Sequence, residues 1–235
     1  MRDVLTIPFS AEEMIIIASD NSGAIGMKEG DSVQVSYKTV GYYSFRTAVM
    51  ECMSAGGHPF AVILQNFCGE AAWEPLLKGI NQGLAELGID DINTTGSTES
   101  NFAMTQSAVG ITVLGKKKSS TELDTELSRI AVIGYPLVGD EVIEREHQIA
   151  PLNIFADFCA IESVVIMPVG SKGILHELNQ LFPKGNLTEA NLDTDLDLQK
   201  SSGPSTCFIV AYPSRIQSEL AWIAGRHFHE IRRLE

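Results

Sequence analysis

Short apolar runs and two segments with helical periodicity alternate along the first half of the chain. The segment 40–55 places apolar residues near the 3.6-residue period, which predicts a helix that ends before Gly56. A second helix is predicted over 73–87, because Gly88 follows its last apolar position. Apolar runs predict strands over 3–7, 14–19, 60–67, 92–95 and 108–114. The second strand is expected to stop at Asp20-Asn21-Ser22-Gly23, whose residue types favour turns.

The second half mixes strands and helices without strict βαβ repeats. Strands are predicted over 129–133, 162–167 and 206–212, and residues 183–205 are polar and irregular. Helices are predicted after Gly139, over 152–159, over 174–182 and in the terminal segment. This order predicts an α+β protein with mixed sheets, since a doubly wound sheet would need regular βαβ units.

A change in composition near residue 117 predicts a domain boundary. The run Lys116-Lys117-Lys118-Ser119-Ser120 follows an alternating apolar segment and precedes a polar one. We therefore expect two domains, over residues 1–117 and 118–235.

The composition narrows the range of partners and compartments. Of the 235 residues, 44% are hydrophobic and the formal net charge is −13, so the chain can form a core but repels polyanions. We expect no binding to nucleic acid and none to a membrane, because no apolar run approaches about 20 residues. The N-terminus lacks the apolar centre of a signal peptide, which predicts a cytoplasmic protein. The four cysteines have no CxxC spacing, so reduced core thiols are favoured over a zinc site or disulfides.

Three carboxylates stand at the ends of predicted elements: Asp3, Asp20 and Glu51. Carboxylates beside a glycine-containing turn are suitable ligands for Mg²⁺, which prefers hard oxygen donors. An acidic protein can bind a nucleotide triphosphate through such an ion, because the ion neutralises the phosphates. Taken singly, each residue also has an ordinary explanation, such as Asp20 capping a turn or Glu51 lying on a helix surface.

Three polar segments could contact phosphate. Gly23 lies in the turn after the second strand, and the segment 94–101 is rich in hydroxyl groups and contains Glu99. The turn Gly170-Ser171-Lys172-Gly173 precedes a predicted helix, whose free N–H groups suit an anion. The alternatives are a hairpin loop, a polar loop and an ordinary turn in which Ser171 caps the helix.

Other common motifs are absent from the sequence. There is no GxxxxGK[ST] phosphate loop, no GxGxxG after a strand and no GxSxG. His227 and His229 alternate and could bind a metal ion, but no third ligand is nearby, so a solvated terminal segment is the favoured interpretation.

The order of these motifs resembles the aminoimidazole ribonucleotide synthetase-like (PurM-like) superfamily, which includes thiamine-monophosphate kinase, selenophosphate synthetase and a hydrogenase-maturation dehydratase. The resemblance spans nearly the whole chain. It rests on the early Asp3, the strand that ends at Asp20, the helix containing Met50-Glu51 before Gly56-Gly57-His58-Pro59, the turn Gly96-Ser97-Thr98, and Gly170-Ser171-Lys172-Gly173. Within the superfamily, the short chain and the variant motifs look most like the alpha-ribazole kinase (alpha-ribazole-5-phosphate synthase) branch, which salvages the lower-ligand nucleoside of cobalamin.

Some positions depart from the superfamily pattern. Met50-Glu51 replaces a usual Asn-Asp, and Ser97 stands where an acid is common, so Glu99 would have to substitute. Lys172 stands where the kinase branch has an acid, which argues against a thiamine-phosphate kinase.

The resemblance implies an N-terminal domain whose strands form a β-barrel across a homodimer, and a C-terminal α+β domain. ATP and Mg²⁺ are expected between the domains, with phosphoryl transfer to a small nucleoside or vitamin precursor, alpha-ribazole being the best candidate. The alternatives are a ring-closing or dehydrating synthetase of the superfamily and a non-catalytic nucleotide-binding regulatory protein. The expected roles are Mg²⁺ ligation by Asp3, Asp20, Glu51 and Glu99, phosphate contacts by Gly23, Gly96, Ser97, Thr98, Gly170 and Ser171, and catalysis by Asp20 and Lys172.

Overall fold

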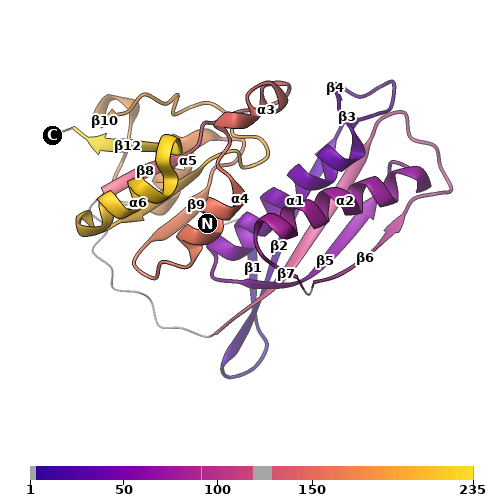
Figure 1. Ribbon diagram of the computed structural model, residues 1–235, viewed down its shortest axis with the longest axis horizontal. Helices are drawn as coiled ribbons and strands as arrows, with labels where there is room; N and C mark the ends of the chain where they lie inside the picture. Colours follow the sequence, from indigo (N-terminus) through magenta and orange to yellow (C-terminus); the bar gives the residue numbers. More distant parts are fainter. Residues whose placement is uncertain (1–3, 91, 119–128, 235) are drawn as a thin grey trace. The chain divides into compact units, whose positions relative to one another are not determined.

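The computed structural model describes residues 4–90, 92–118 and 129–234 (Figure 1). This part of the chain divides into two compact units near residue 120, which we call the N-terminal unit and the C-terminal unit. Asp3 lies outside the described residues.

The N-terminal unit is built on a five-stranded sheet with the order β1-β2-β7-β5-β6. Its strands are β1 (Val4–Pro8), β2 (Glu13–Gly23), β5 (His58–Asn66), β6 (Asn93–Thr98) and β7 (Ala108–Lys118). The pairing is antiparallel except between β5 and β6, which run parallel. The short strands β3 (Ile25–Gly26) and β4 (Val33–Gln34) form a separate parallel pair.

Two helices, α1 (Tyr37–Ser54) and α2 (Trp73–Glu86), pack on each other and cover one face of this sheet. Ile16 and Ala18 of β2, Leu64 of β5 and Ile111 of β7 are fully buried beneath them. Glycine lets the helices approach closely, because a Cβ on Gly79 would lie 2.1 Å from the Lys38 carbonyl oxygen.

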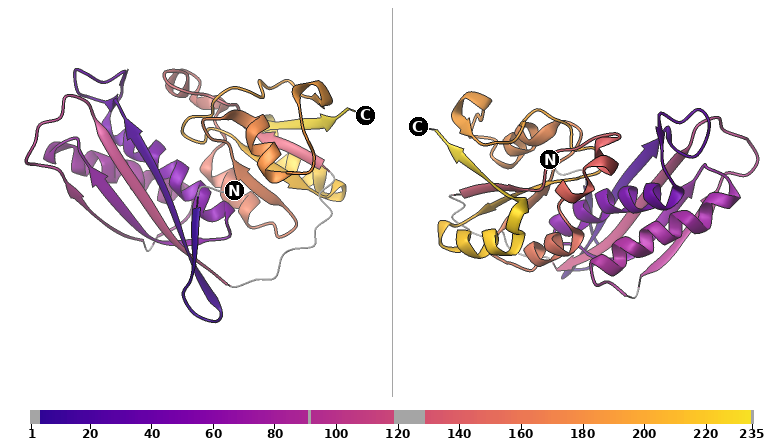
Figure 2. Two further views of the ribbon diagram at one scale, coloured as in Figure 1. Left: turned by 180° about the vertical axis from the view of Figure 1, so that it is seen from behind. Right: turned by 45° about the horizontal axis from the view of Figure 1, so that its top comes forward.

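The opposite face of the sheet carries no helix or strand of the described part of the N-terminal unit (Figure 2). Leu5 pairs with Ile17, and Ile17 pairs with Leu114, so three apolar side chains form a row on this face. Leu5 is 58% exposed, so the row remains partly open to solvent.

The C-terminal unit contains a second five-stranded sheet, with the order β10-β12-β8-β11-β9 and antiparallel pairing. Its strands are β8 (Arg129–Ile133), β9 (Val165–Pro168), β10 (Leu192–Asp193), β11 (Phe208–Tyr212) and β12 (Phe228–Arg233). Its helices are α3 (Glu141–Glu144), α4 (Leu152–Cys159), α5 (Gly173–Leu181) and α6 (Gln217–Ala224).

Both faces of the second sheet are covered, which explains why β11 is buried along its whole length. On one face, the Phe208 ring packs edge-on against Phe155 and Phe158 of α4. On the other face, Ile209 packs in a cluster with Ile174 and Leu178 of α5. Successive side chains of β11 point to opposite faces of the sheet, so this one strand contributes to a hydrophobic core on each face.

The predicted α+β class is confirmed, and so are most predicted elements. The turn predicted at Asp20–Gly23 is wrong, because β2 continues through these residues by pairing with residues 108–111 of β7. The strand predicted over 92–95 extends as β6 to Thr98, so the alternative of a polar loop over 94–101 is wrong up to that residue. In both places the ladder to a buried neighbour outweighs the local turn preference.

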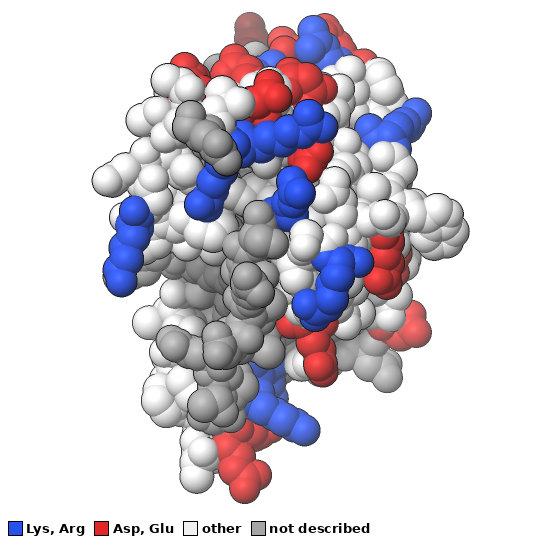
Figure 3. Space-filling model, turned by 90° about the vertical axis from the view of Figure 1, so that its left-hand side faces the viewer, with Lys and Arg blue, Asp and Glu red and all other residues white. Residues whose placement is uncertain are grey.

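The terminal segment was predicted to be helical, but it ends in the strand β12 after α6. The interpretation of His227 and His229 as solvated residues is wrong, because both are buried. None of the helices in the described residues has the length and apolarity needed to cross a bilayer. Figure 3 shows a face on which basic and acidic side chains are interspersed.

Candidate functional site

Asp20 and Gly96 lie in one row across the N-terminal sheet. Asp20 pairs with Ile111, Ile111 with Leu64, and Leu64 with Gly96. Three strand spacings of about 4.8 Å place the Cα atoms of Asp20 and Gly96 about 14 Å apart. The structure thus brings the predicted carboxylate and the predicted Gly-Ser-Thr segment to the same level of one sheet.

Asp20 is directed toward the helix-covered face of the sheet. It follows Ile16 and Ala18 at intervals of two residues along β2, and both of these are fully buried. Burial of the carboxyl raises the pKa of Asp20 to about 7, against the opposing effect of a hydrogen bond from the Asn21 backbone. A nearby cation would stabilise the ionised form of this carboxyl and offset the cost of burying its charge.

Glu51 does not lie at the level of Asp20. A Cβ on Gly57 would touch both Cys52 and Ile16, so the end of α1 that carries Glu51 lies over Ile16. Asp20 lies four residues further along β2, which corresponds to about 13 Å. The described residues contain no group of three His, Cys, Asp or Glu side chains suited to a metal ion. The expected Mg²⁺ ligands are therefore not assembled as a cluster within this part of the chain.

Glu99 follows the last residue of β6 and organises the next turn. Its Oε1 atom accepts hydrogen bonds from the backbone N–H groups of Asn101 (2.7 Å) and Phe102 (3.2 Å). Its own N–H donates to the carbonyl oxygen of Asn66 at 2.8 Å. The carboxylate thus fixes the start of the loop after β6.

Asn66 ties the ends of the parallel strands β5 and β6 together. Its side-chain amide donates to the Thr98 hydroxyl oxygen and to the Gly69 carbonyl oxygen, both at 3.0 Å. Its Oδ1 atom accepts from the Cys68 N–H at 2.8 Å. Asn66 is 1% exposed, so this buried amide sets the geometry of the segment that contains Thr98. No motif in the sequence points to this residue.

The candidate glycines differ in what surrounds them. A Cβ on Gly96 would lie 1.9 Å from the Leu64 carbonyl oxygen, so the close approach of β6 to β5 requires glycine there. A Cβ on Gly23 would meet nothing within 4 Å. Packing therefore explains Gly96 but leaves Gly23 without a structural requirement. Ser97, beside Gly96, is exposed on the edge strand.

The glycine turn of the C-terminal unit connects β9 to α5. The Gly170 carbonyl oxygen accepts hydrogen bonds from the N–H groups of Ser202 (3.1 Å) and Gly173 (3.3 Å). Lys172 occupies the N-cap position without a side-chain cap bond, so the alternative in which Ser171 caps α5 is wrong. Ser171 and Lys172 are exposed.

Two further polar clusters were not predicted from the sequence. In the C-terminal unit, His229 Nδ1 lies 3.2 Å from the Asp195 carboxylate, and the His229 ring packs edge-on against Tyr135. In the N-terminal unit, Asp31 accepts hydrogen bonds from the backbone and hydroxyl of Ser107. Both clusters join segments that are distant in the sequence, and no local motif signals them.

No protein-family model and no curated protein matches the sequence. Solved structures with similar folds do exist. The structure of T. maritima PurL complexed with ATP matches 98% of the chain with a TM-score of 0.61 and 15% identity. AaThiL complexed with AMPPCP and TMP matches 100% of the chain with a TM-score of 0.63 and 10% identity. The protein tt0281 from Thermus thermophilus matches 99%, with a TM-score of 0.62 and 13% identity.

The chain covers these proteins to different extents. It spans 42% of the T. maritima PurL chain, which is less than half of its length. It spans 85% of AaThiL and 86% of tt0281. The similarity extends over both units of the present chain, at identities that establish the fold alone. The chain therefore has the fold of these solved structures.

Proposed function

We propose that this protein binds ATP with Mg²⁺ and transfers a phosphoryl group to a small nucleoside, with alpha-ribazole as the best candidate acceptor. The observation that carries the proposal is the row from Asp20 to Gly96, in a fold shared with proteins solved with ATP, ADP or AMPPCP. The row places a carboxylate and a segment rich in hydroxyl groups about 14 Å apart. The buried side chains of Ile111 and Leu64 lie between them, so we assign the two ends of the row to separate contacts, with Mg²⁺ and with the phosphates.

We assign Asp20 as the principal protein ligand of Mg²⁺. Magnesium usually keeps several waters and takes one or two carboxylates together with substrate phosphates, so it does not need a preformed cluster. Asp3 is the further candidate ligand. Glu99 cannot share one ion with Asp20, because it follows Gly96 by three residues and Gly96 is already about 14 Å from Asp20. Glu51 is given no part in this ion, because α1 carries it to a different level of the sheet.

The resemblance implies phosphate contacts in each unit, and we keep these residues as candidates. In the N-terminal unit we assign Gly23, Gly96, Ser97 and Thr98 to the nucleotide. In the C-terminal unit, Gly170 and Ser171 would contact phosphate, and the exposed Lys172 would stabilise charge on the transferring group. Phosphoryl transfer depends mainly on positioning and electrostatics, which a cation and oriented N–H groups supply.

A homodimer is part of the proposal. The apolar row of Leu5, Ile17 and Leu114 lies on a sheet face without a covering layer in the described N-terminal unit. Monomeric proteins seldom leave such a face open, and a second copy of this chain would bury it. This supports the cross-dimer barrel expected from the resemblance.

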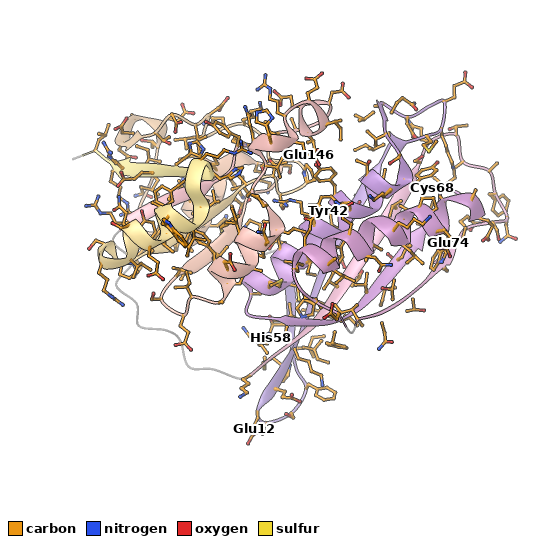
Figure 4. All side chains as sticks on the ribbon, in the orientation of Figure 1. Glu12, Tyr42, His58, Cys68, Glu74 and Glu146 are labelled. Carbon is orange, nitrogen blue, oxygen red and sulfur yellow. The ribbon has the colours of Figure 1, made fainter. Side chains whose placement is uncertain are left out.

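Binding of the nucleotide is tested by calorimetry with ATP in the presence and absence of Mg²⁺. We expect Asp20→Asn to abolish the Mg²⁺-dependent part of the affinity. The matched control is Glu12→Gln, an exposed acid in the hairpin between β1 and β2 (Figure 4). Undiminished Mg²⁺-dependent affinity in Asp20→Asn would refute the assignment of Asp20.

Turnover is tested by ADP release with alpha-ribazole, followed by mass spectrometry of the product. A stable phosphorylated nucleoside supports the kinase, whereas a dehydrated or ring-closed product from another substrate shows a synthetase instead. Binding of ATP without turnover of any nucleoside or vitamin precursor shows a regulatory protein. We expect Lys172→Ala to lower kcat more than it lowers ATP affinity, and equal losses would assign Lys172 to ground-state binding.

A further inference from the structure

One end of the N-terminal sheet exposes apolar side chains that the fold does not use. Phe102 is 79% exposed, Met27 is 64% exposed, and Phe67 and Met104 are each 40% exposed. They come from three loops: the β3–β4 loop, the loop after β5 and the loop between β6 and β7. Single exposed apolar residues are common, so the relation between these three loops decides whether the four residues act together.

Hydrogen bonds hold these three loops together. Lys28 Nζ donates to the Phe67 carbonyl oxygen at 3.1 Å, which joins the β3–β4 loop to the end of β5. The Gln106 side chain donates to the Gly30 carbonyl oxygen at 2.7 Å, which joins the β3–β4 loop to the β6–β7 loop. Glu99 joins the end of β5 to the β6–β7 loop, because its N–H donates to the Asn66 carbonyl oxygen and its carboxylate accepts from the Phe102 N–H. The patch formed by Met27, Phe67, Phe102 and Met104 is therefore built on a fixed frame.

The patch lies beside the proposed nucleotide site. Phe67 follows Asn66, which bonds to Thr98, and Phe102 is joined through Glu99 to the same strand end. Cys68 and Glu74, labelled in Figure 4, mark this end of the N-terminal unit. A compound that occupies the patch would therefore stand next to the hydroxyl groups of β6.

The charges around the patch indicate what kind of compound it accepts. The loops 26–32, 66–74 and 98–107 contain a single lysine, whose Nζ donates to a backbone oxygen, and five acidic residues: Glu29, Asp31, Glu70, Glu74 and Glu99. Without a bound cation, acidic surroundings repel a phosphorylated compound and favour a neutral or positively charged one. Exposed phenylalanine rings supply stacking surfaces for a planar ring.

We propose that the patch of Met27, Phe67, Phe102 and Met104 binds the planar heteroaromatic ring of an unphosphorylated acceptor. The inference rests on the proposed function, because it assigns the ring of the acceptor to one edge of that site. It also predicts selectivity, since the acidic surroundings disfavour the phosphorylated product and promote its release.

The experiment is a titration of the 235-residue chain with alpha-ribazole in the absence of ATP, followed by calorimetry or by saturation-transfer NMR of the ring protons. We expect saturable binding, an affinity lowered about tenfold by Phe102→Ala, and a smaller loss in Phe102→Leu, which keeps an apolar side chain. Trp222→Ala is the matched control, because Trp222 is an equally exposed aromatic residue (84%) on α6 of the C-terminal unit. The 5′-phosphate of alpha-ribazole should bind more weakly than the nucleoside.

Each remaining outcome overturns the inference. Absence of saturable binding removes the ring site, and equal affinities of the wild type and Phe102→Ala place the ring elsewhere. A change of oligomeric state in Phe102→Ala, measured by sedimentation, would show that the patch is a protein–protein contact. Because the titration contains no ATP, a failure of the nucleotide proposal leaves its result intact, and ATP affinity of Phe102→Ala reports on the nucleotide site separately.

Discussion

Asp31 and Ser107 are 76 positions apart in the chain and form two hydrogen bonds of 2.6 Å each. The Ser107 N–H donates to Oδ1 of Asp31, and the Ser107 hydroxyl donates to Oδ2. Tyr37, at the start of α1, places its hydroxyl 3.1 Å from the same serine oxygen. The pair thereby connects the β3–β4 loop, the entry to β7 and the first turn of α1.

Loss of the Ser107 hydroxyl should destabilise the N-terminal unit. Ser107→Ala leaves a buried carboxylate oxygen with one donor fewer, so we expect a loss of about 1–3 kcal/mol in the free energy of unfolding. Urea denaturation followed by circular dichroism measures this loss. The same substitution at Ser100, which is exposed in the loop after β6, should change stability by less than about 0.5 kcal/mol. Equal effects at the two positions would contradict a structural role for the pair.

The same carboxylate should make stability sensitive to acid. Burial alone would raise the pKa of Asp31, but hydrogen bonds from Ser107 and Lys28 outweigh burial and hold this pKa below its usual range. The folded state therefore favours the ionised form, and its contribution is present at neutral pH and lost as the pH falls below about 4. Asp31→Asn should remove this part of the acid sensitivity in denaturation measured from neutral pH down to about pH 3. An unchanged acid profile would contradict the prediction.

Asp20 should have the opposite effect on stability. Its folded-state pKa is about 7, raised by burial, whereas the carboxyl in the unfolded chain ionises near 4. Between these two values the folded state binds more protons, so the contribution of Asp20 to stability falls as the pH rises, by at most about 1.4 kcal/mol per pH unit. Relative to the wild type, Asp20→Asn should therefore gain stability between about pH 4 and pH 7 in urea denaturation without Mg²⁺. A constant difference between the two proteins over this range would refute the buried environment of Asp20.

The crossing of α1 and α2 should depend on Gly79. A Cβ at this position would lie 2.1 Å from the Lys38 carbonyl oxygen and 2.5 Å from the Tyr42 nitrogen, so the helices would have to move apart. We expect Gly79→Ala to cost about 1–3 kcal/mol, even though alanine is the better helix former by about 1 kcal/mol. Gly23→Ala is the control, since no atom lies within 4 Å of its Cβ position. A stabilised Gly79→Ala, measured by thermal denaturation, would contradict this packing of the two helices.

Hydrophobic periodicity was sufficient to predict the main elements, because apolar burial determines both helices of the N-terminal unit and most strands. It failed where tertiary pairing outweighs local preference. Asp20-Asn21-Ser22-Gly23 is a typical turn sequence, yet it is held in β2 by a ladder to β7. His227 and His229 look like solvated terminal residues, yet their place in and beside β12 buries both. The local sequence does not reveal either of these strand pairings, because each depends on a partner strand that is distant in the chain.

Tertiary packing also limits what the sequence can predict about the candidate site. Residue chemistry and order predicted Asp20 and the segment Gly96–Thr98 as candidate site residues, and the sheet register aligns Asp20 with Gly96. The distance between Asp20 and Glu51 could not be predicted, because it depends on which end of α1 packs over which part of β2. Asn66 carries no motif, so only its buried hydrogen bonds reveal its role.

The proposed homodimer can be tested at Leu5. Leu5 is 58% exposed on the edge strand β1 and adjoins Ile17 on the uncovered sheet face, so Leu5→Asp should not impair folding of the monomer. A charge in the centre of a buried interface is expensive, and a stable interface needs about 800 Å² per partner. We therefore expect sedimentation velocity to show a dimer for the wild type and a monomer for Leu5→Asp.

The control for this test is Trp222→Asp, which places the same charge at an exposed aromatic position on α6. It should sediment as the wild type does, because a charge on a free surface leaves the sheet face unchanged. A wild type that stays monomeric at every concentration, or a Leu5→Asp variant that remains a dimer, would show that another surface or no surface joins the subunits. In that case the apolar row would need a different covering layer, since its exposure is unfavourable in water.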